Sequence, residues 1–427
     1  MRIGGRLAGA IEILADIEDR SRPIANALKD WGTAHRFAGS GDRAAIGNIV
    51  YDALRMKLSH AWLMDDDNPA ALGHAVLFRQ WGLSPETLAA ALDGDKFAPE
   101  PLPEASLAAF ASRKLEDAPD HVRADLPEWI LPSFQANFAD DWLGEAEALN
   151  QRPSLDLRVN TLKAAREKVA KALVRAGALA SPIAPQGLRI PPGSGADRLP
   201  NVTAELSFQK GWFEVQDEGS QLVAALAGAE KGEQVLDYCA GGGGKTLALS
   251  AMMENTGQIH AYDADRTRLS PIIERLRRAG TRNVQVHDDV SALDRLEGRL
   301  DRVLIDAPCT GTGTWRRRPD IKWRLSERNI EERTGQQREV LSAASRYVRP
   351  GGTLIYVTCS LLPEENQRQI ERFLSEESAF EPVDLAAVWK EKFTTGTPLE
   401  SGFGSLTLSP ARTATDGFYC AALRRRG

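Results

Sequence analysis

The chain has 427 residues, of which 42% are apolar and 26% charged, and its formal net charge is −6. This length predicts about three domains of ordinary globular composition. The negative charge argues mildly against a protein that coats nucleic acid, because neutralising phosphates requires Lys and Arg, but it leaves open an enzyme that grips a nucleic acid locally. No run of about 20 apolar residues is present, so we expect neither a signal peptide nor a membrane span, and we expect a cytoplasmic location.

Residues 1–140 are predicted to form an all-α domain. Within 42–57, apolar residues recur at the i, i+3 and i+4 spacing of a helix, and Asp42 is the expected N-cap. A second helix is expected over 84–92, where Ser84 is a capping residue and Pro85 occupies the first helical position. Strand signals are nearly absent from this part of the chain.

Residues 141–230 are predicted to form a small α+β module. Residues 155–160 alternate apolar and polar side chains like a strand, and 164–177 has the pattern of a helix that ends at Gly177. Further short strands are expected at 187–190 and 211–215.

Residues 231–427 alternate regularly between apolar runs and helical stretches. The runs are continuous rather than alternating, which favours strands buried on both faces of a parallel sheet. They lie at 233–239, 257–263, 283–288, 301–308 and 352–359, and a late strand is expected within 416–426. This repetition predicts a doubly wound α/β sheet with a ligand crevice beyond the carboxyl ends of its strands.

Four successive glycines, Gly241–Gly244, follow the first of these strands and precede a helix. Such a loop allows the backbone to approach a ligand closely. A phosphate-binding P-loop is excluded because Cys239 stands where its first glycine is required. A dinucleotide fingerprint also fails, because Thr246 or Leu247 stands where its last glycine is required. The loop therefore favours a nucleoside-type ligand without a tightly cradled pyrophosphate.

Two acidic residues stand at the ends of the next strands. Asp263 lies about 20 residues beyond the glycine loop, where a carboxylate accepts both ribose hydroxyls in NAD and S-adenosylmethionine sites alike. Asp289 follows the third strand, where a carboxylate can receive an adenine amino group. A solvated turn is the alternative interpretation of Asp289.

Four cysteines are present, and no C-x-x-C spacing or His pair accompanies them, so we expect neither a zinc site nor another metal site. Cys309 follows the fourth strand in an Asp-Ala-Pro-Cys turn, and Cys359 follows the fifth in a Thr-Cys-Ser turn. Adjacent strand ends would bring both thiols together with Asp306. Cysteine is well suited to nucleophilic addition to a pyrimidine, although a lone cysteine near a strand end is more often a small buried apolar residue.

Three stretches, VLDYCAGGGGKT, DAPCTGTGTWRRRPDIKW and YVTCSLLPEENQ, resemble the RsmB/Sun (NSUN) family of RNA cytosine-5 methyltransferases, and RPSLDLRVN with VQDEGSQLVA extends the match upstream. The resemblance implies an α/β fold class in which a doubly wound, Rossmann-like methyltransferase domain (231–427) follows a small α+β, RRM-like module (141–230) and an all-α, NusB-like domain (1–140). Both upstream parts are implied to bind RNA.

The same resemblance implies the roles of individual residues. Cys359 would attack carbon 6 of cytosine, Cys309 would assist release of the product, and Asp306 would hydrogen-bond the base and border the cofactor. S-adenosylmethionine would be held by Cys239, Ala240, Gly241, Gly242, Gly243, Gly244, Lys245, Asp263, Asp289 and Asp306. The family loop usually reads C-A-A-P-G-G-K, so Gly241 and Gly242 replace an alanine and a proline, and the free loop is expected to be more flexible.

A basic and aromatic segment follows the Cys309 turn. It contains Trp315, Arg316, Arg317, Arg318, Lys322, Trp323 and Arg324. Cations beside aromatic rings can grip phosphates and stack on bases, so we expect this segment to contact the substrate. Arg424–Arg426 at the end of the chain is either a nucleic-acid contact or a solubilising tail.

The resemblance implies small-subunit (16S) ribosomal RNA as the target, and no obligate protein partner is inferred. The alternatives are a tRNA or DNA cytosine-5 methyltransferase and a non-catalytic RNA-binding factor of ribosome assembly. An NAD-dependent dehydrogenase is disfavoured by the failed glycine pattern.

Overall fold

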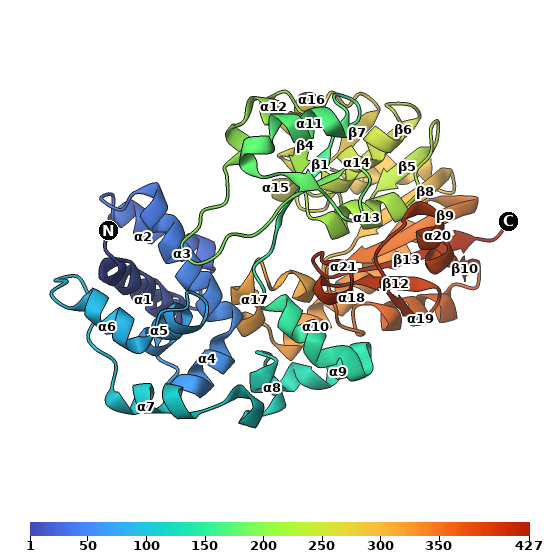
Figure 1. Ribbon diagram of the computed structural model, residues 1–427. Helices are drawn as coiled ribbons and strands as arrows, with labels where there is room; N and C mark the ends of the chain where they lie inside the picture. The colour runs from blue at the N-terminus through green and yellow to red at the C-terminus, as the bar shows by residue number, and fades with distance from the viewer. The chain divides into compact units, whose positions relative to one another are not determined.

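The computed structural model describes residues 1–427 and divides into two compact units (Figure 1). The helical unit consists of residues 1–153, 192–199 and 314–325. The other unit consists of residues 154–191, 200–313 and 326–427 and is named the catalytic unit because it contains the two cysteines that the sequence predicts to react. Two short stretches from the later sequence are therefore part of the helical unit. No helix in the chain has the length and apolar character needed to cross a bilayer.

The helical unit packs around apolar faces of its longer helices, with Leu7, Ile49 and Val76 fully buried. Its helices are α1 (Ile3–Arg20), α2 (Ile24–Ala34), α3 (Ser40–Arg55), α4 (Lys57–Met64), α5 (Pro69–Arg79), α6 (Pro85–Leu92), α7 (Glu104–Ser112), α8 (Asp120–Arg123), α9 (Leu131–Phe138), α10 (Trp142–Leu149) and α17 (Pro319–Arg324). Short 3-10 helices cover Leu115–Asp117, Glu128–Ile130 and Ala139–Asp141. The all-α expectation for this part is confirmed.

The two predicted caps have different outcomes. Ser84 caps α6 as expected, because its hydroxyl accepts a hydrogen bond from the backbone N–H of Thr87. Asp42 as the N-cap of α3 is wrong. The helix starts at Ser40 with Gly39 at the N-cap, and Asp42 is its third residue, whose carboxylate accepts from the Gly39 N–H.

The first part of the catalytic unit is a small α+β module with the predicted strands. Its elements are β1 (Leu155–Val159), α11 (Arg166–Ala172), a 3-10 helix (Val174–Ala176), β2 (Leu179–Ala180), β3 (Gly187–Ile190), a 3-10 helix (Val202–Ala204), α12 (Leu206–Gln209) and β4 (Phe213–Val215). The strands form an antiparallel sheet in the order β2-β3-β1-β4. Leu157, Val159 and Phe213 point into its own core, so alternate residues of β1 face the rest of the unit.

The large sheet has nine strands, and the five predicted apolar runs form its parallel part. Its strands are β5 (Gln234–Asp237), β6 (Gln258–Tyr262), β7 (Val284–His287), β8 (Leu300–Asp306), β9 (Val348–Thr358), β10 (Phe380–Pro382), β11 (Leu399–Ser401), β12 (Ser405–Leu408) and β13 (Phe418–Arg425). The order is β11-β12-β13-β9-β8-β5-β6-β7, with β10 also paired to β13. Strands β7, β6, β5, β8 and β9 are mutually parallel, whereas β13 is antiparallel to β9. The predicted doubly wound sheet and late strand are confirmed.

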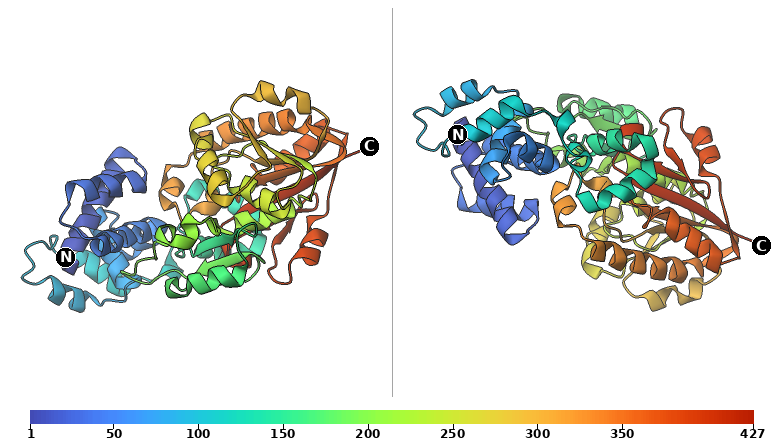
Figure 2. Two further views of the ribbon diagram at one scale, coloured as in Figure 1. Left: turned by 90° about the horizontal axis from the view of Figure 1, so that it is seen from above. Right: turned by 90° about the horizontal axis from the view of Figure 1, so that it is seen from below.

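Helices cover both faces of this sheet, as the two views of Figure 2 show. The helices are α13 (Glu218–Leu226), α14 (Gly244–Met252), α15 (Arg266–Leu269), α16 (Ile272–Ala279), α18 (Glu327–Ser345), α19 (Gln367–Glu376), α20 (Leu385–Lys392) and α21 (Pro410–Thr413), with 3-10 helices at Val290–Leu296 and Thr312–Thr314. The core on one face includes α13, α14 and α20, and the core on the other includes α18 and α19. The strand order reverses between β5 and β8, which places the crevice at their carboxyl ends.

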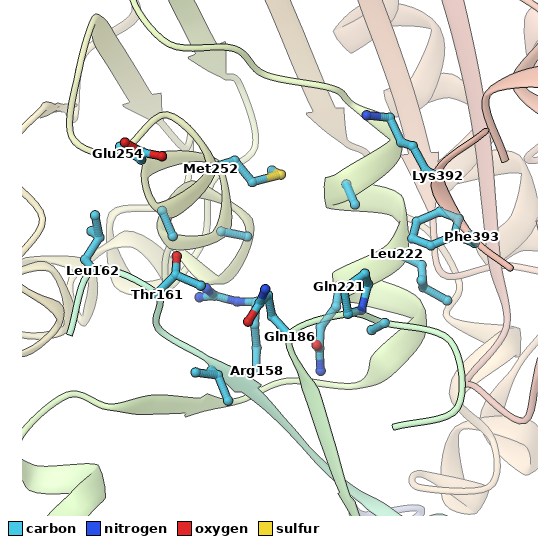
Figure 3. A pocket seen from close by; sticks show the side chains of 16 residues that line it. Arg158, Thr161, Leu162, Gln186, Gln221, Leu222, Met252, Glu254, Lys392 and Phe393 are labelled. Atoms are coloured by element: carbon cyan, nitrogen blue, oxygen red, sulfur yellow. The ribbon is translucent and has the colours of Figure 1, made fainter. Parts of the chain in front are cut away.

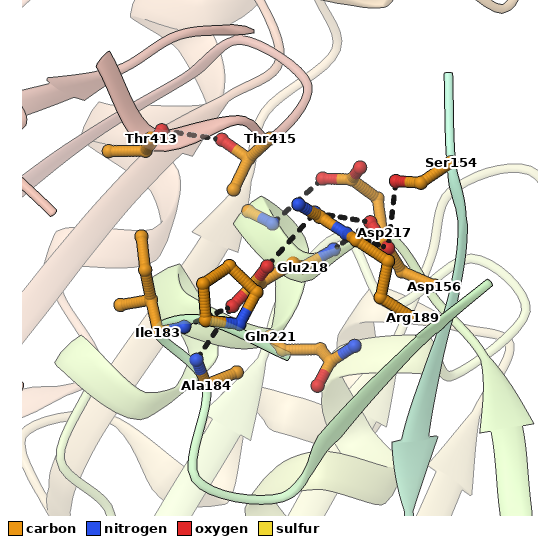
Figure 4. Close-up of polar contacts among 12 residues, drawn as sticks. Ser154, Asp156, Ile183, Ala184, Arg189, Asp217, Glu218, Gln221, Thr413 and Thr415 are labelled. Atoms are coloured by element: carbon orange, nitrogen blue, oxygen red, sulfur yellow. Dashed lines mark hydrogen bonds and ion pairs between the residues drawn. The ribbon is translucent and has the colours of Figure 1, made fainter. Parts of the chain in front are cut away.

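A buried polar layer joins the small module to the large sheet (Figure 4). The Arg189 guanidinium donates to Asp156 Oδ1 at 2.7 Å and forms an ion pair with Glu218 at 2.9 Å. Glu218 Oε1 also accepts from the backbone N–H groups of Ile183 and Ala184 at 2.9 and 2.7 Å. These contacts satisfy charges that would otherwise be costly to bury, so they fix the module against α13.

Candidate functional site

The glycine loop connects β5 to α14 through a sharp turn. Gly241 and Gly243 have φ angles of 49° and 80°, a region that favours glycine. A Cβ on Gly243 would lie 2.5 Å from Cγ1 of Ile272. The Ala240 N–H donates to the Tyr262 carbonyl, which ties the loop to the end of β6. The loop therefore needs glycine for its shape at Gly241 and also for close packing at Gly243.

The structure brings Asp263 to the glycine loop but leaves Asp289 in solvent. Asp263 is buried, and its Oδ2 accepts from the Gly241 N–H at 2.9 Å, while its Oδ1 accepts from the Asp265 N–H at 2.8 Å. Asp289 is exposed at the end of β7, where it accepts from the Ser291 N–H. That hydrogen bond lowers the pKa of Asp289, so its carboxylate is ionised at neutral pH.

Buried charges gather beside the loop at the ends of β5 and β8. Lys245 forms an ion pair of 2.7 Å with Asp306. Burial alone lowers the pKa of Lys245, but Asp306 and Asp237 outweigh it and the net shift is upward. Burial raises the pKa of Asp237 to about 7. Asp237 Oδ2 accepts from the Thr246 hydroxyl at 2.7 Å, whereas its Oδ1 is buried without a hydrogen-bond partner.

Cys239 lies at the turn after β5, and burial raises the pKa of its thiol. The neighbouring carboxylates of Asp263 and Asp306 shift this pKa in the same direction. Cys239 therefore remains a neutral thiol at the floor of the loop. Such a group can line a pocket for an uncharged ring, and it is a poor nucleophile.

The thiols of Cys309 and Cys359 meet in one site, 3.3 Å apart. Both residues are partly exposed, so the pair is accessible from outside. The hydrogen bond with Cys359 and burial together raise the pKa of Cys309 well above its usual value. Cys309 therefore keeps its proton at neutral pH and can donate it toward the sulfur of Cys359. The pair therefore places a protonated Cys309 thiol in direct contact with the Cys359 sulfur.

A buried carboxylate, which the sequence analysis did not single out, holds the Cys309 turn. Glu365 accepts from the Thr310 N–H at 2.8 Å and from its hydroxyl at 2.5 Å. Gln337 donates to Glu365 at 3.0 Å and to the Pro308 carbonyl at 2.9 Å. Two acidic residues a few positions after the Thr-Cys-Ser turn were the available signal, but only the fold reveals that Glu365 holds the residue next to the other cysteine.

Two glycines pack against each other beneath the cysteines. The Gly417 N–H donates to the Gly313 carbonyl at 2.8 Å, and the Gly313 N–H donates to the Cys359 carbonyl at 2.9 Å. A Cβ on Gly313 would lie 2.3 Å from the Gly417 carbonyl oxygen. This close approach links the segment after Cys309 to both Cys359 and the start of β13, and it leaves no room for a side chain.

The structure contradicts the expectation that the basic and aromatic segment as a whole forms an exposed substrate-binding surface. Trp315 is fully buried and stacks on Phe134 with ring centroids 6.4 Å apart. Lys322 is also buried, and its ammonium donates to the Arg55 carbonyl at 2.9 Å and to Asn150 Oδ1 at 3.0 Å. Burial lowers the pKa of Lys322 to about 8. These side chains stabilise the helical unit.

The remaining members of that segment differ in exposure. Arg316 is buried, and the Trp323 indole N–H donates to the Leu54 carbonyl at 2.6 Å. Arg317 is half-buried, whereas Arg318 and Arg324 are exposed. At the end of the chain, Arg424 and Arg425 belong to β13, and the Arg425 guanidinium donates to the Val348 carbonyl.

The large sheet has the fold of the S-adenosylmethionine-dependent methyltransferases, and the glycine loop and the acidic residues lie at the carboxyl ends of its parallel strands. A sequence model described as 16S rRNA methyltransferase RsmB/F matches residues 223–424, and one described as a ferredoxin-like domain of RsmF/B-like methyltransferases matches residues 126–193. Ribosomal RNA small subunit methyltransferase B of Citrobacter koseri is 36% identical over 328 residues, which cover 76% of this chain and 70% of that protein. The chain belongs to the RsmB/F methyltransferase family.

Two further relatives agree with this assignment. Ribosomal RNA small subunit methyltransferase B of Pectobacterium atrosepticum is 36% identical over 308 residues, which cover 70% of this chain and 66% of that protein. The chain thus matches just under two thirds of the length of this relative. A solved methyltransferase homolog from Pyrococcus horikoshii is 28% identical, with a TM-score of 0.60 over 72% of this chain and 97% of that one.

Proposed function

We propose that this chain methylates carbon 5 of a cytosine in ribosomal RNA, with 16S RNA as the target. The observation that carries the proposal is the contact between two accessible thiols, from the ends of neighbouring strands, beside a methyltransferase cofactor crevice. A methyl transfer to oxygen or nitrogen needs no thiol nucleophile, whereas the weakly nucleophilic cytosine carbon does. The relatives named as ribosomal RNA methyltransferases support the choice of substrate.

The residues of the crevice fit S-adenosylmethionine. Asp263 offers a carboxylate for ribose hydroxyls, and exposed Asp289 offers one for the adenine amino group. The unpartnered Oδ1 of Asp237 suits the amino group of the methionine part, and Lys245 suits its carboxylate. Space beside Gly241 is open, since a Cβ there would meet nothing closer than 3.6 Å. When bound, this cofactor supplies a methyl group on a positively charged sulfur.

In the proposed mechanism, the Cys359 thiolate adds to carbon 6 of the cytosine and forms a covalent S–C bond. Carbon 5 becomes enamine-like and takes the methyl group. The proton of carbon 5 then passes to water while the S–C6 bond breaks with its electron pair on sulfur, which releases 5-methylcytosine and regenerates the Cys359 thiolate. Cys309 lies 3.3 Å from the reacting sulfur, and we assign it to this release step. Asp306 ends β8 and pairs with Lys245 at 2.7 Å, and we assign its carboxylate to hydrogen-bond the base edge.

The full-length protein tests this proposal in a side-by-side assay. We expect methyl transfer from S-adenosylmethionine to 16S RNA transcripts, and bisulfite sequencing of the product locates a single protected cytosine. Transfer only to DNA or to tRNA would replace the assigned substrate, and modification that bisulfite does not detect would contradict carbon 5 as the acceptor. Absence of S-adenosylmethionine binding in calorimetry would leave a non-catalytic RNA-binding protein.

Replacing Gly242 by proline is expected to tighten S-adenosylmethionine binding. The Gly242 N–H makes no hydrogen bond, so a proline there removes no contact and reduces the freedom of the unbound loop. We expect the dissociation constant, measured by calorimetry, to fall about two- to fivefold, which corresponds to about 0.4–1 kcal/mol.

The matched control is Gly241→Ala in the same loop. Gly241 has a φ of 49°, so an alanine there is strained and is expected to weaken binding by a similar factor. Equal effects of the two substitutions, or weaker binding by the proline variant, would contradict this account of the loop.

A further inference from the structure

A second cavity lies away from the cysteines, between the small α+β module and the large sheet. Its volume is about 540 Å³. One side is formed by β1 and the loops that follow β1 and precede β3, and the other by α13, the second half of α14 and the end of α20 (Figure 3). The apolar part of its lining consists of Val159, Leu162, Ala184, Pro185, Leu222, Ala225, Ala248, Ala251, Met252 and Phe393.

Arg158 is the buried charge of this cavity. Only 6% of the residue is exposed, and the guanidinium lies beside Thr161 and Gln186 inside the cavity (Figure 3). Its Nε donates to Gln216 Oε1 at 2.6 Å. Neither Nη atom makes a hydrogen bond or an ion pair within the protein, so two parallel N–H donors are available to a ligand.

The surroundings of Arg158 carry an excess of positive charge. Its cross-strand neighbour Glu214 is shared between Arg275 and Arg278, which approach it more closely. Glu254 on the cavity rim forms an ion pair of 2.8 Å with Lys231. Burial lowers the pKa of Arg158 to about 10. This shift agrees with a buried guanidinium that has no carboxylate paired with it alone. The cavity therefore favours a ligand with adjacent acceptors.

We propose that this cavity binds a guanine base. A guanidinium that offers both Nη donors matches the neighbouring O6 and N7 acceptors of guanine, whereas adenine presents a donor at one of these positions. The apolar side chains provide walls for a flat ring, and the thioether of Met252 can pack against its edge. The base comes from an unpaired guanosine of RNA or from a free guanine nucleotide. Only the first source rests on the proposed function.

The cavity also has a short connection to the cofactor loop. Gln216 accepts a hydrogen bond from Arg158 and lies beside Gly244 of the glycine loop. A Cβ added to Gly244 would be 3.8 Å from Gln216 Nε2. A guanine bound to Arg158 would therefore affect the position of Gln216, which lies next to the glycine loop. The expected consequence is a change in S-adenosylmethionine affinity when the cavity is filled.

The test is photo-crosslinking of the full-length protein with 6-thioguanosine, either as the 5′-monophosphate or as the sole modified residue of a single-stranded RNA. We expect crosslinks in peptides that contain Met252 or Phe393, and competition by GMP but not by AMP or inorganic phosphate. Crosslinking by the RNA alone identifies an RNA nucleotide as the occupant, and crosslinking by the nucleotide alone identifies a free ligand. Crosslinks elsewhere, or equal competition by inorganic phosphate, would overturn the proposal.

Two variants make the test specific. Arg158→Met removes the two donors, and Ala225→Phe fills the cavity while keeping Arg158, so each should reduce the crosslink at least fivefold. Ala387→Phe, at an exposed position of α20 outside the lining, is the matched control and should leave the crosslink unchanged.

Methyl transfer is measured on the same preparations. A protein that methylates RNA without this crosslink disproves the cavity assignment alone, and one that crosslinks without methylating disproves the proposed function alone.

Discussion

Replacing Cys359 by alanine should abolish methyl transfer to RNA, with a loss of at least about 10³-fold in rate. The reason is that no other side chain in the site can form the bond to carbon 6. Cys309 lies 3.3 Å away, and even without the Cys359 thiol its burial and the neighbouring Glu365 carboxylate continue to raise its pKa. A single-turnover assay with radiolabelled S-adenosylmethionine measures the remaining rate.

Cys420→Ala is the control for loss of a thiol. Cys420 is buried in β13 within the apolar core, away from solvent, so its replacement should retain most of the activity at a small cost in stability. Calorimetric binding of S-adenosylmethionine should be unchanged in Cys359→Ala, which separates lost chemistry from lost folding. Near-normal transfer by Cys359→Ala would disprove the covalent mechanism.

Replacing Cys309 by serine should trap the protein on its RNA. If Cys309 assists cleavage of the S–C6 bond, the adduct forms through Cys359 and then persists. On a denaturing gel with labelled 16S RNA and S-adenosylmethionine, we expect a shifted band that accounts for most of the enzyme, and multiple turnover should fall at least about 100-fold.

The double variant Cys309→Ser with Cys359→Ser is the matched control, because without the attacking thiol no band should survive denaturation. Thermal unfolding of the single variant should stay close to that of the original protein, since serine preserves the size of the side chain. A Cys309→Ser protein that turns over normally and leaves no adduct would remove Cys309 from the release step.

The fold was predicted well where the local order of apolar and polar residues directly reflects how a segment is buried. Continuous apolar runs such as 352–359 are buried on both faces, so they indicated parallel strands directly. The convergence of Cys309 and Cys359 followed from the same reasoning, because both stand at the ends of adjacent strands. The short strands β2, β10, β11 and β12 were not predicted, because runs of two to four residues carry little periodicity.

The errors arose where a residue in a recognisable local pattern contacts a residue that is far away in the sequence. Lys322 and Trp315 look like a nucleic-acid surface in the sequence, yet their partners Asn150 and Phe134 lie more than 170 residues earlier. Likewise, Glu365 stabilises the Cys309 turn across 55 residues, and no spacing rule connects the two positions. Asp42 differs in kind, because a glycine N-cap three residues earlier leaves no side-chain signal.

The helical unit is assembled from three separate stretches of chain, and this limits how the protein can be divided. The chain leaves the catalytic unit at Gly313, four residues after Cys309, and returns at Ser326. A fragment beginning at Ser154 would carry Trp315 and Lys322 without the side chains that bury them, and it would expose an aromatic segment that directly follows the Cys309 turn. Chimeras between relatives should therefore exchange residues 1–153 together with 192–199 and 314–325, since a single crossover point would separate parts that fold as one body.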